Sequence, residues 1–425
     1  MENASPEVAV VRMYAAREEI YPREVQGRYA SLRWFFVWAT QLLFYGLPWL
    51  NWNGRQAVLF DLGARKFYIF GIVLWPQDFI YLAALLIISA YSLFLFTAIF
   101  GRVWCGFTCP QTVYTEIFMW TGFTFVGYFT PIHVLAAEVM FLGLGPWEWF
   151  WVLFYSFATY GNAGWMREQV CKYMCPYARF QSAMFDKDSL IITYDQTRGE
   201  PRGARNKSDP ESAKSLGDCI DCSMCVQVCP TGIDIRKGLQ YECIGCAACV
   251  DACNNVMDKI GAPRGLVRYW TDHAMTYRWS TDQILRHAFR PRVIIYSVVL
   301  GVIVSVFVGT LLTRTPLKMD VIRDRGSMGR EIEDGMIENV YRLQIMNTEE
   351  NAHRYRISVS GIAGIALEGG ADLALGPTES KGVPVNIRIP AGAGEKGSNK
   401  ILVTIADADN PDVQISEKAV FFVPR

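Results

Sequence analysis

The sequence predicts a multi-domain protein with an α-helical membrane domain of about five transmembrane helices, an inserted bacterial-type di-cluster ferredoxin module of the α+β class, and a C-terminal all-β sandwich. Three observations support this fold class. The 425-residue chain contains five long apolar runs, all twelve cysteines fall between Cys105 and Cys253, and roughly the last ninety residues alternate between apolar and polar positions. The net charge is zero, so the composition indicates no nucleic-acid partner.

The apolar runs predict the membrane spans. Each run has 18 to 22 residues, which is about the length needed to cross a bilayer core of roughly 30 Å. Four runs are uncharged, whereas the third carries Glu116. A carboxylate there is costly unless it is paired or hydrated, so Glu116 is a candidate for proton or ion transfer. The expected spans are 34–52, 79–100, 113–130, 149–166 and 293–312.

The distribution of lysine and arginine predicts the orientation. None lies in 131–148, whereas 18 lie in 164–293 around a long hydrophilic stretch. Because cytoplasmic loops are enriched in these residues, we expect the ferredoxin part to be cytoplasmic. The N-terminal segment lacks the pattern of a cleaved signal peptide and predicts a cytoplasmic tail. Five spans then place the β part on the opposite side, and the aromatic stretch 67–79 is expected to dip into the interface.

These observations divide the chain into six parts. The segment before the clustered soluble cysteines is rich in Asp, Arg, Gly, Pro and Ser, which favours a linker. The β part shows no catalytic constellation, because its single histidine, His353, stands alone. The expected parts are a cytoplasmic tail, 1–33; a membrane domain with two Cys-x3-Cys-Pro motifs, 34–185; a linker, 186–218; a cytoplasmic ferredoxin-like domain with two iron–sulfur clusters, 219–290; a last transmembrane helix, 291–313; and the β domain, 314–425.

Eight cysteines follow the spacing of a two-cluster ferredoxin. The runs CIDCSMCVQVCPTGI and CIGCAACVDACN each contain C-x2-C-x2-C-x3-C, and in such proteins the fourth cysteine of each run ligates the other cluster. We therefore expect one [4Fe-4S] cluster on Cys219, Cys222, Cys225 and Cys253, and another on Cys243, Cys246, Cys249 and Cys229. The alternative is two structural zinc sites, but zinc motifs usually bring their cysteines in two separated pairs.

The other four cysteines form two Cys-x3-Cys-Pro motifs, each at the expected cytoplasmic end of a span. They are Cys105, Cys109, Cys171 and Cys175. Positions i and i+4 share a helix face, and Pro110 and Pro176 predict a kink and a new helix start. Four convergent thiolates could hold zinc or an iron–sulfur cluster, whereas two or three suit Cu(I). The alternative is that they are buried apolar residues.

Three further features concern the chemistry of the membrane domain. Arg102 and Lys172 lie close to the motif cysteines in sequence and could stabilise thiolate forms. His133 has no second histidine within a span, so a bis-histidine haem is not expected. The tryptophans and tyrosines near the ends of the spans predict interfacial anchors rather than a quinone site.

Several long stretches carry a resemblance to one family. They include PWLNWNGRQAVLFDLGARKFYIFG, GRVWCGFTCPQTVYTEIFMW, NAGWMREQVCKYMCPYARFQSAMFDKDSL and the eight-cysteine segment, which resemble the cytochrome c oxidase accessory proteins called CcoG, FixG or RdxA. The resemblance implies a bacterial inner-membrane iron–sulfur protein with a periplasmic immunoglobulin-like C-terminal domain. It also implies assembly of cbb3-type cytochrome oxidase by reduction of Cu(II) to Cu(I), with the copper chemistry at the two Cys-x3-Cys-Pro motifs.

One stretch departs from the family pattern. Trp120 is followed directly by Thr121, where relatives carry a charged segment and further apolar residues. The connection is therefore shorter, although one helix over about 111–131 can still cross and keep the number of spans odd.

The sequence thus predicts a membrane-bound cupric reductase with two [4Fe-4S] clusters. An unidentified cytoplasmic donor would supply electrons, and copper would be the substrate or a transient ligand. Expected partners are membrane lipid and a copper chaperone or cbb3-type oxidase assembly factors, and a homodimer stays open. Two other functions also stay open: a quinol-linked electron relay that feeds another redox enzyme, and a non-enzymatic assembly scaffold.

Overall fold

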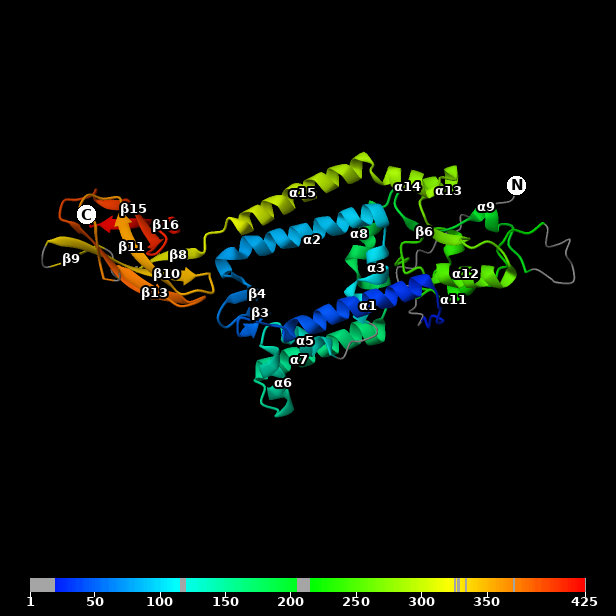
Figure 1. Ribbon diagram of the computed structural model, residues 1–425, viewed down its shortest axis with the longest axis horizontal. Helices are drawn as coiled ribbons and strands as arrows, with labels where there is room; N and C mark the ends of the chain where they lie inside the picture. The colour runs from blue at the N-terminus through cyan, green and yellow to red at the C-terminus, as the bar shows by residue number, and fades with distance from the viewer. Residues whose placement is uncertain are drawn as a thin grey trace, which may run out of the picture. The chain divides into compact units, whose positions relative to one another are not determined.

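The chain forms two compact units, each built from three separate segments (Figure 1). The computed structural model describes residues 20–114, 120–204, 215–324, 326, 329–332, 335–369 and 371–424. The first unit comprises Met1–Leu43, Ala90–Gly122 and Leu153–Val298. The second comprises Phe44–Ser89, Phe123–Val152 and Val299–Arg425. The polypeptide therefore passes from one unit to the other five times.

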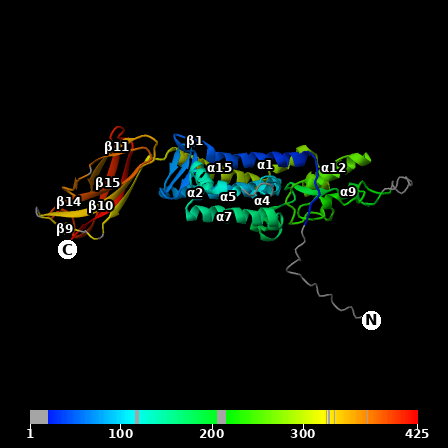
Figure 2. The same ribbon diagram turned by 90° about the horizontal axis from the view of Figure 1, so that it is seen from below.

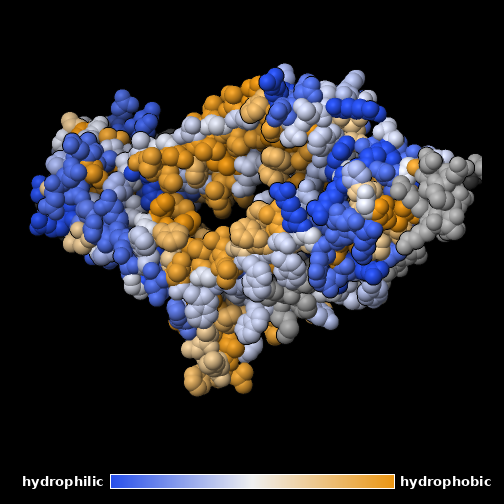
Figure 3. Space-filling view, turned by 45° about the vertical axis from the view of Figure 1, so that its right-hand side comes forward, coloured by the Kyte–Doolittle hydropathy of each residue, from blue (hydrophilic) through white to orange (hydrophobic). Residues whose placement is uncertain are grey.

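Two helices are long and apolar enough to cross a membrane, among the residues that the structure describes. They are α2 (Phe79–Phe100, extended to Pro76 by a preceding turn) and α15 (Pro291–Leu312). Figures 1 and 2 show them side by side, and the ring of Tyr81 near the start of α2 contacts Phe307 near the end of α15. Apolar side chains cover the long helices in Figure 3. These two helices indicate that the chain associates with a membrane.

The expectation of about five transmembrane helices is therefore corrected to two helices of sufficient length and hydropathy. The run 34–52 begins in α1 (Arg28–Gly46), which includes two arginines, and continues through a 3-10 turn at Leu47–Trp49 into a short strand at Asn51–Trp52. The run 149–166 is split between α7 (Pro146–Thr159) and a π-helical segment, Tyr160–Met166, rich in poor helix formers.

In the described residues of the expected span 113–130, α5 (Thr121–Val126) is followed by turns at 127–130 and not by further helix. The span also includes the last described residues of α4 (Pro110–Tyr114). Glu116, the candidate for proton or ion transfer, lies outside the described residues. The chain continues through α6 (Ile132–Met140).

The ferredoxin part of the first unit has a small α+β core. Strand β6 (Ile191–Tyr194) pairs antiparallel with β7 (Val267–Trp270), so the expected linker 186–218 contributes a strand to this core. Helix α12 (Ala248–Ile260) packs Val250 and Met257 into it. Other helices of the first unit, among its described residues, are α3 (Val103–Phe107), α8 (Pro176–Met184), α9 (Gln196–Gly199), α11 (Met224–Gln227), α13 (Asp272–Tyr277) and α14 (Thr281–Ala288), with a 3-10 turn at Ile235–Lys237.

The C-terminal part of the second unit is a sandwich of two antiparallel sheets. One sheet has the order β12-β14-β10-β8 with β9 paired to β10, and the other has the order β13-β11-β15-β16. Its alternating apolar residues, such as Leu343, Val385 and Val403, form one core. The strands are β8 (Leu317–Arg323), β9 (Arg330–Glu331), β10 (Met336–Asn347), β11 (His353–Ser360), β12 (Ala366–Glu368), β13 (Asp372–Leu375), β14 (Ser380–Pro390), β15 (Gly397–Asp407) and β16 (Gln414–Val423).

The aromatic stretch 67–79 belongs largely to a β-meander in the same unit. Its strands are β3 (Val58–Asp61), β4 (Lys66–Ile69) and β5 (Ile72–Leu74), preceded by the hairpin β1 (Asn51–Trp52) and β2 (Arg55–Gln56). Leu59, Tyr68, Val73 and Trp75 share a buried cluster with Met346 of β10. Asp78 is 4% exposed and forms ion pairs with Lys318 and, at 3.5 Å, with Arg314. The meander is thus packed against the sandwich.

Candidate iron–sulfur and thiol centre

The eight ferredoxin cysteines surround two small apolar cavities. One cavity, with about 370 Å³ of empty space, is lined by the first ligand set, which we define as Cys219, Cys222, Cys225 and Cys253. The other, with about 330 Å³, is lined by the second ligand set, Cys229, Cys243, Cys246 and Cys249, together with Cys225. Each cavity is thus lined by the four cysteines of one expected set, with Cys253 and Cys229 as the members from the other run, and Cys225 lines both cavities.

The two ligand loops have the same backbone conformation. Asp221 and Ser223 in the first loop have φ of 52° and 54°, and Gly245 and Ala247 at the equivalent positions of the second have 68° and 59°. Successive residues that alternate between right- and left-handed conformations turn their N–H groups into a concave site for an anionic group. Helices α11 and α12 begin directly after Ser223 and Ala247.

The thiol chemistry of the two sets is governed by burial. Burial raises the pKa of Cys225 to about 11 and the pKa of Cys243 and Cys253 to about 12. Because a thiol must be deprotonated to ligate a metal, loading these sites with iron has to release protons. Eight thiols in two apolar cavities fit two [4Fe-4S] clusters, each of which would accept and release one electron at a time when bound.

The prolines of the two Cys-x3-Cys-Pro motifs start new helices, as predicted. Helix α4 begins at Pro110 and α8 begins at Pro176, with Cys175 in an extended conformation as its N-cap. The second motif differs from the expected α-helical turn. Cys171 lies in a π-helical turn, Val170–Met174, and the N–H of Cys175 donates to the carbonyl of Val170, five residues earlier. Helix-face reasoning based on i and i+4 therefore does not apply to that pair.

The structure brings the four motif cysteines together, although the two motifs are more than sixty residues apart in the chain. We call Cys105, Cys109, Cys171 and Cys175 the motif thiols. Burial, with smaller contributions from the nearby other three motif thiols and Glu168, raises the pKa of Cys171 to about 12. In the part of the chain that is described, no three His, Cys, Asp or Glu side chains are gathered for a single metal ion.

The first motif also touches the second ligand set. Gly106 lies between Cys105 and Cys109, and a Cβ built on it would lie 2.6 Å from the carbonyl oxygen of Gly245 and 2.8 Å from the backbone nitrogen of Cys246. Glu168, which is 8% exposed, acts electrostatically on both Cys246 and Cys171. The second ligand set is therefore adjacent to the motif thiols.

Arg102 lies in a different place from the one expected. Its guanidinium donates to the carbonyl oxygens of Tyr241, Cys243 (3.0 Å) and Ala178, so it bridges the second ligand loop and α8. Lys172 lies 5.4 Å from the ring centre of Tyr173, a cation–π contact. The roles of Gly106 and Glu168 were not predicted from the sequence, although a glycine between two motif cysteines is a signal for close backbone approach.

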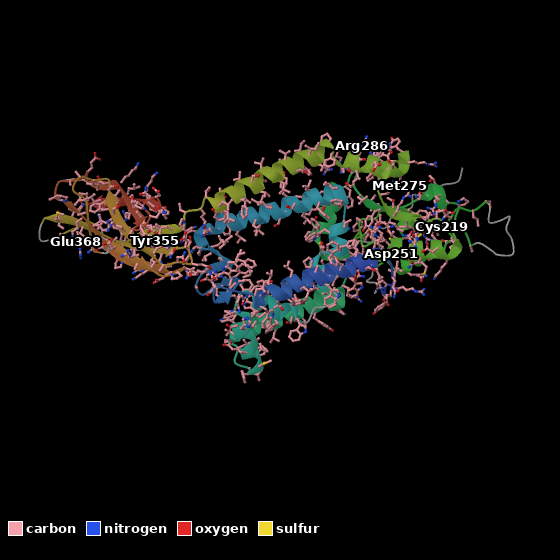
Figure 4. The ribbon with its side chains drawn as sticks, viewed as in Figure 1. Cys219, Asp251, Met275, Arg286, Tyr355 and Glu368 are labelled. Carbon is pink, nitrogen blue, oxygen red and sulfur yellow. The ribbon has the colours of Figure 1, made fainter. Side chains whose placement is uncertain are left out.

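Helix α1 also contacts the ferredoxin part of this unit. Asp251 of α12, labelled in Figure 4 with Cys219, accepts a hydrogen bond from the N–H of Ala30 at 2.8 Å. The ring of Tyr29 lies 5.4 Å from that of Tyr269, whose hydroxyl donates to the carbonyl of Gly245. The start of α1 thereby supports the second ligand loop.

Three family models match parts of the chain. A "4Fe-4S dicluster domain" matches residues 166–272, and a "4Fe-4S binding domain" matches 82–126. A third model, an "IG-like fold at C-terminal of FixG", matches 307–424. The first covers both ligand sets and the second motif, whereas the second covers Cys105 and Cys109.

The curated relatives extend the match to most of the chain. Protein RdxB of Cereibacter sphaeroides is 36% identical over 412 residues, covering 85% of this chain and 86% of its own. This chain belongs to the FixG/RdxA family. Protein RdxA of the same organism is 33% identical, covering 85% and 87%, and the nitrogen fixation protein FixG of Rhizobium meliloti is 32% identical, covering 88% and 87%. The resemblance seen in the sequence is thus confirmed.

Membership of the FixG/RdxA family confirms three expectations. The chain carries 4Fe-4S domains, as its cysteine spacing predicts, and its C-terminal part is the immunoglobulin-like domain of this family. The iron–sulfur domains indicate a redox protein. The alignment with FixG runs over 454 positions, whereas this family member has 425 residues. FixG therefore has residues that this chain lacks.

Proposed function

We propose that this protein is a membrane-bound iron–sulfur cupric reductase, which reduces Cu(II) to Cu(I) for the assembly of cbb3-type cytochrome c oxidase. The observation that supports the proposal best is the contact between the first motif and the second ligand loop, at Gly106 and Cys246. This contact places the iron–sulfur module next to four thiols that are not needed to ligate its two clusters. Electrons would come from a cytoplasmic donor, and copper is the substrate.

The motif thiols suit both the reaction and its product. Reduction of one Cu(II) consumes one electron, which matches the one-electron chemistry of iron–sulfur centres. Thiolates are soft ligands and stabilise Cu(I) over Cu(II). Because Cys171 is buried among the other three, copper binding there would have to displace a proton from a thiol of raised pKa. Copper capture is therefore expected to weaken as the pH falls.

The proposed topology places the tail and the ferredoxin part in the cytoplasm and the sandwich in the periplasm of a bacterial inner membrane. The 18 lysines and arginines between residues 164 and 293 favour a cytoplasmic ferredoxin part. A copper chaperone or an oxidase assembly factor would receive the product.

The motif thiols have a second candidate occupant, a third iron–sulfur cluster. The match of a 4Fe-4S binding model to 82–126, which includes Cys105 and Cys109, favours it. Metal analysis of the purified full-length protein separates the two. Two clusters require about eight iron atoms per chain, whereas a third would raise the count to about twelve.

The proposal is tested by the double variant Cys109→Ser, Cys175→Ser in detergent-purified protein that has first been reduced with dithionite. We expect Cu(II) reduction, followed with a Cu(I)-specific chelator, to be lost, while the EPR signals of the two ligand sets persist. Trp104→Phe, in the same segment, is the matched control and should leave both readouts unchanged.

Cu(II) reduction by the double variant at the rate of the unaltered protein would overturn the assignment of the motif thiols. If the unaltered protein itself reduces no Cu(II), the reductase function is wrong. Delivery is tested separately in cells that carry the double variant, where the copper content of the cbb3-type oxidase should fall.

A further inference from the structure

The contact between Gly106 and the second ligand loop leaves no room for a side chain. An ordinary contact of a Cβ is at least 3.4 Å, so a methyl group at Gly106 would force the carbonyl oxygen of Gly245 to retreat by about 0.8 Å from its 2.6 Å position. The neighbouring atoms are backbone atoms of Gly245 and Cys246. They cannot rotate away as a flexible side chain can.

The same loop is held from several other directions. A Cβ on Gly245 would lie 3.0 Å from the carbonyl carbon and oxygen of Arg102. A side chain at Gly245 would therefore also be crowded, like one at Gly106. The guanidinium of Arg102 donates hydrogen bonds to the carbonyls of Tyr241 and Cys243 in this loop, and the hydroxyl of Tyr269 donates to the carbonyl of Gly245. The loop is therefore fixed against the first motif rather than resting on it.

The first ligand set has a different environment. Cys222 is exposed to solvent, whereas the four cysteines of the second ligand set are half-buried. Next to Cys222, Asp221 forms an ion pair with Arg236 and lies 3.8 Å from Arg202, at the surface. A soluble donor can therefore approach the first set directly, while the second set is covered on the side of the motif.

Two positive charges lie near the second ligand set. Arg102 bonds to the carbonyl of Cys243, and Arg33 acts electrostatically on Cys246. The potential of an iron–sulfur centre depends on nearby charge, hydrogen bonds and solvent exposure. Arg102 and Arg33 favour an added electron at the second ligand set, whereas the carboxylate of Glu168 opposes it.

We propose that Gly106 is a positioning residue, which couples the second ligand set to the motif thiols by direct backbone contact, whereas the first ligand set, at exposed Cys222, faces the electron donor. This inference rests on the proposed function for the identity of the final acceptor. It assigns electron entry to the first ligand set and electron exit to the second.

The test compares Gly106→Ala with Gly161→Ala. A Cβ on Gly161 meets nothing within 4 Å, so this control measures only the gain in helix propensity, about 1 kcal/mol for alanine over glycine. Both glycines lie in helical segments of the first unit. Propensity alone therefore predicts that both variants are stabilised, whereas the contact predicts the opposite for Gly106→Ala. Gly106→Val extends the series.

The first readout needs no metal. Hydrogen exchange, measured by mass spectrometry on chelator-treated protein, should speed up in the peptides covering 102–109 and 241–249 of Gly106→Ala but not in those covering 219–229. The second readout is EPR of the loaded protein. Only the signal that Cys246→Ser alters should change in Gly106→Ala, and the signal that Cys222→Ser alters should not.

The third readout is oxidation of the dithionite-reduced protein by two oxidants. With Cu(II) we expect Gly106→Ala to slow oxidation on the order of tenfold, since sub-ångström misplacement carries penalties of this size. With ferricyanide, which can take electrons at exposed Cys222, the rate should be unchanged.

Three results would overturn the inference: exchange and EPR in Gly106→Ala equal to those in Gly161→Ala, an altered signal from the first ligand set, or equal slowing with both oxidants. Failure of the proposed function looks different. In that case the unaltered protein does not pass electrons to Cu(II), while the exchange and EPR differences between the glycine variants persist.

Discussion

Arg102→Lys tests how the second ligand loop is attached to the membrane segment. Arg102 is 5% exposed and donates to three backbone carbonyls, those of Tyr241, Cys243 and Ala178. Lysine keeps the charge, but its single ammonium cannot reproduce the planar fork that reaches carbonyls on two segments. Two of the three carbonyls would therefore lose a charged donor in a buried site.

The magnitude follows from the number of hydrogen bonds lost. A hydrogen bond to a charged group contributes about 1.5–3 kcal/mol, so losing two corresponds to roughly 3–6 kcal/mol before any water enters. A free-energy change of about 1.4 kcal/mol changes an equilibrium constant tenfold. Half of the lower value of roughly 3 kcal/mol should therefore raise the population of the detached loop about tenfold. Iron held by the second ligand set should then be lost faster.

The assay is release of iron to a chelator, combined with EPR of the two clusters over time. We expect the signal of the second ligand set to decay at least about tenfold faster in Arg102→Lys, with the first set little affected. Arg264→Lys is the control, because Arg264 pairs with the carboxylate of Asp258 at a solvent-exposed site and not with buried carbonyls. Decay of both signals at the unaltered rate in Arg102→Lys would refute the reasoning.

Three other predictions concern the second unit. Burial opposes ionisation of Asp407, but the N–H groups of Asp409 and Asn410 and the ring of His353 outweigh it and hold the pKa of Asp407 below its ordinary value. The ionised carboxylate of Asp407 therefore stabilises the folded sandwich above about pH 3.9, and this contribution is lost as the pH falls through the lowered pKa. Asp407→Asn should remove this acid-dependent part of unfolding, measured by hydrogen exchange of 397–407. An unchanged acid transition in the variant would contradict the prediction. The buried amide of Gln56 donates to the carbonyls of Val58 and Gly127 and accepts from the N–H of Ile132. Gln56→Ala should therefore lower the stability of the second unit by about 1–3 kcal/mol for each buried group left without a partner. Hydrogen exchange over 127–132 should become faster, and exchange at the unaltered rate would count against this prediction. Asp78→Asn leaves Lys318 and Arg314 without their carboxylate and should destabilise the sandwich by about 3–5 kcal/mol in guanidinium unfolding, whereas a loss below about 1 kcal/mol would show that water replaces the pair.

The parts of the fold that local patterns encode could be predicted from the sequence. The β-sandwich follows from alternation along each strand, and the helix starts at Pro110 and Pro176 follow from the fixed φ of proline. The membrane helices were predicted less well. A run of apolar residues fixes hydropathy but not helix continuity, and Tyr160–Met166 adopts a π-helical conformation within such a run.

Some residues escaped prediction because their partners are distant in the chain. Strand β6 looks like part of a linker until it pairs with β7, more than seventy residues later. Arg102 was expected to serve the neighbouring motif thiols, yet its guanidinium reaches Tyr241 and Cys243. Neither the position nor the spacing of a residue reveals a partner that only folding brings near.

The sequence by itself determined the chemistry of this protein: twelve cysteines, eight in the spacing of two iron–sulfur clusters and four in paired Cys-x3-Cys-Pro motifs. Covalent spacing fixes which three cysteines of each expected ligand set share a loop, whereas the exchange of the fourth cysteine between the two sets stays a prediction. Only the tertiary structure decided that the four motif thiols lie together and that Gly106 packs on the loop of Cys246. The physical reason is that backbone packing between distant segments depends on shape, and shape leaves no periodic signal in the sequence.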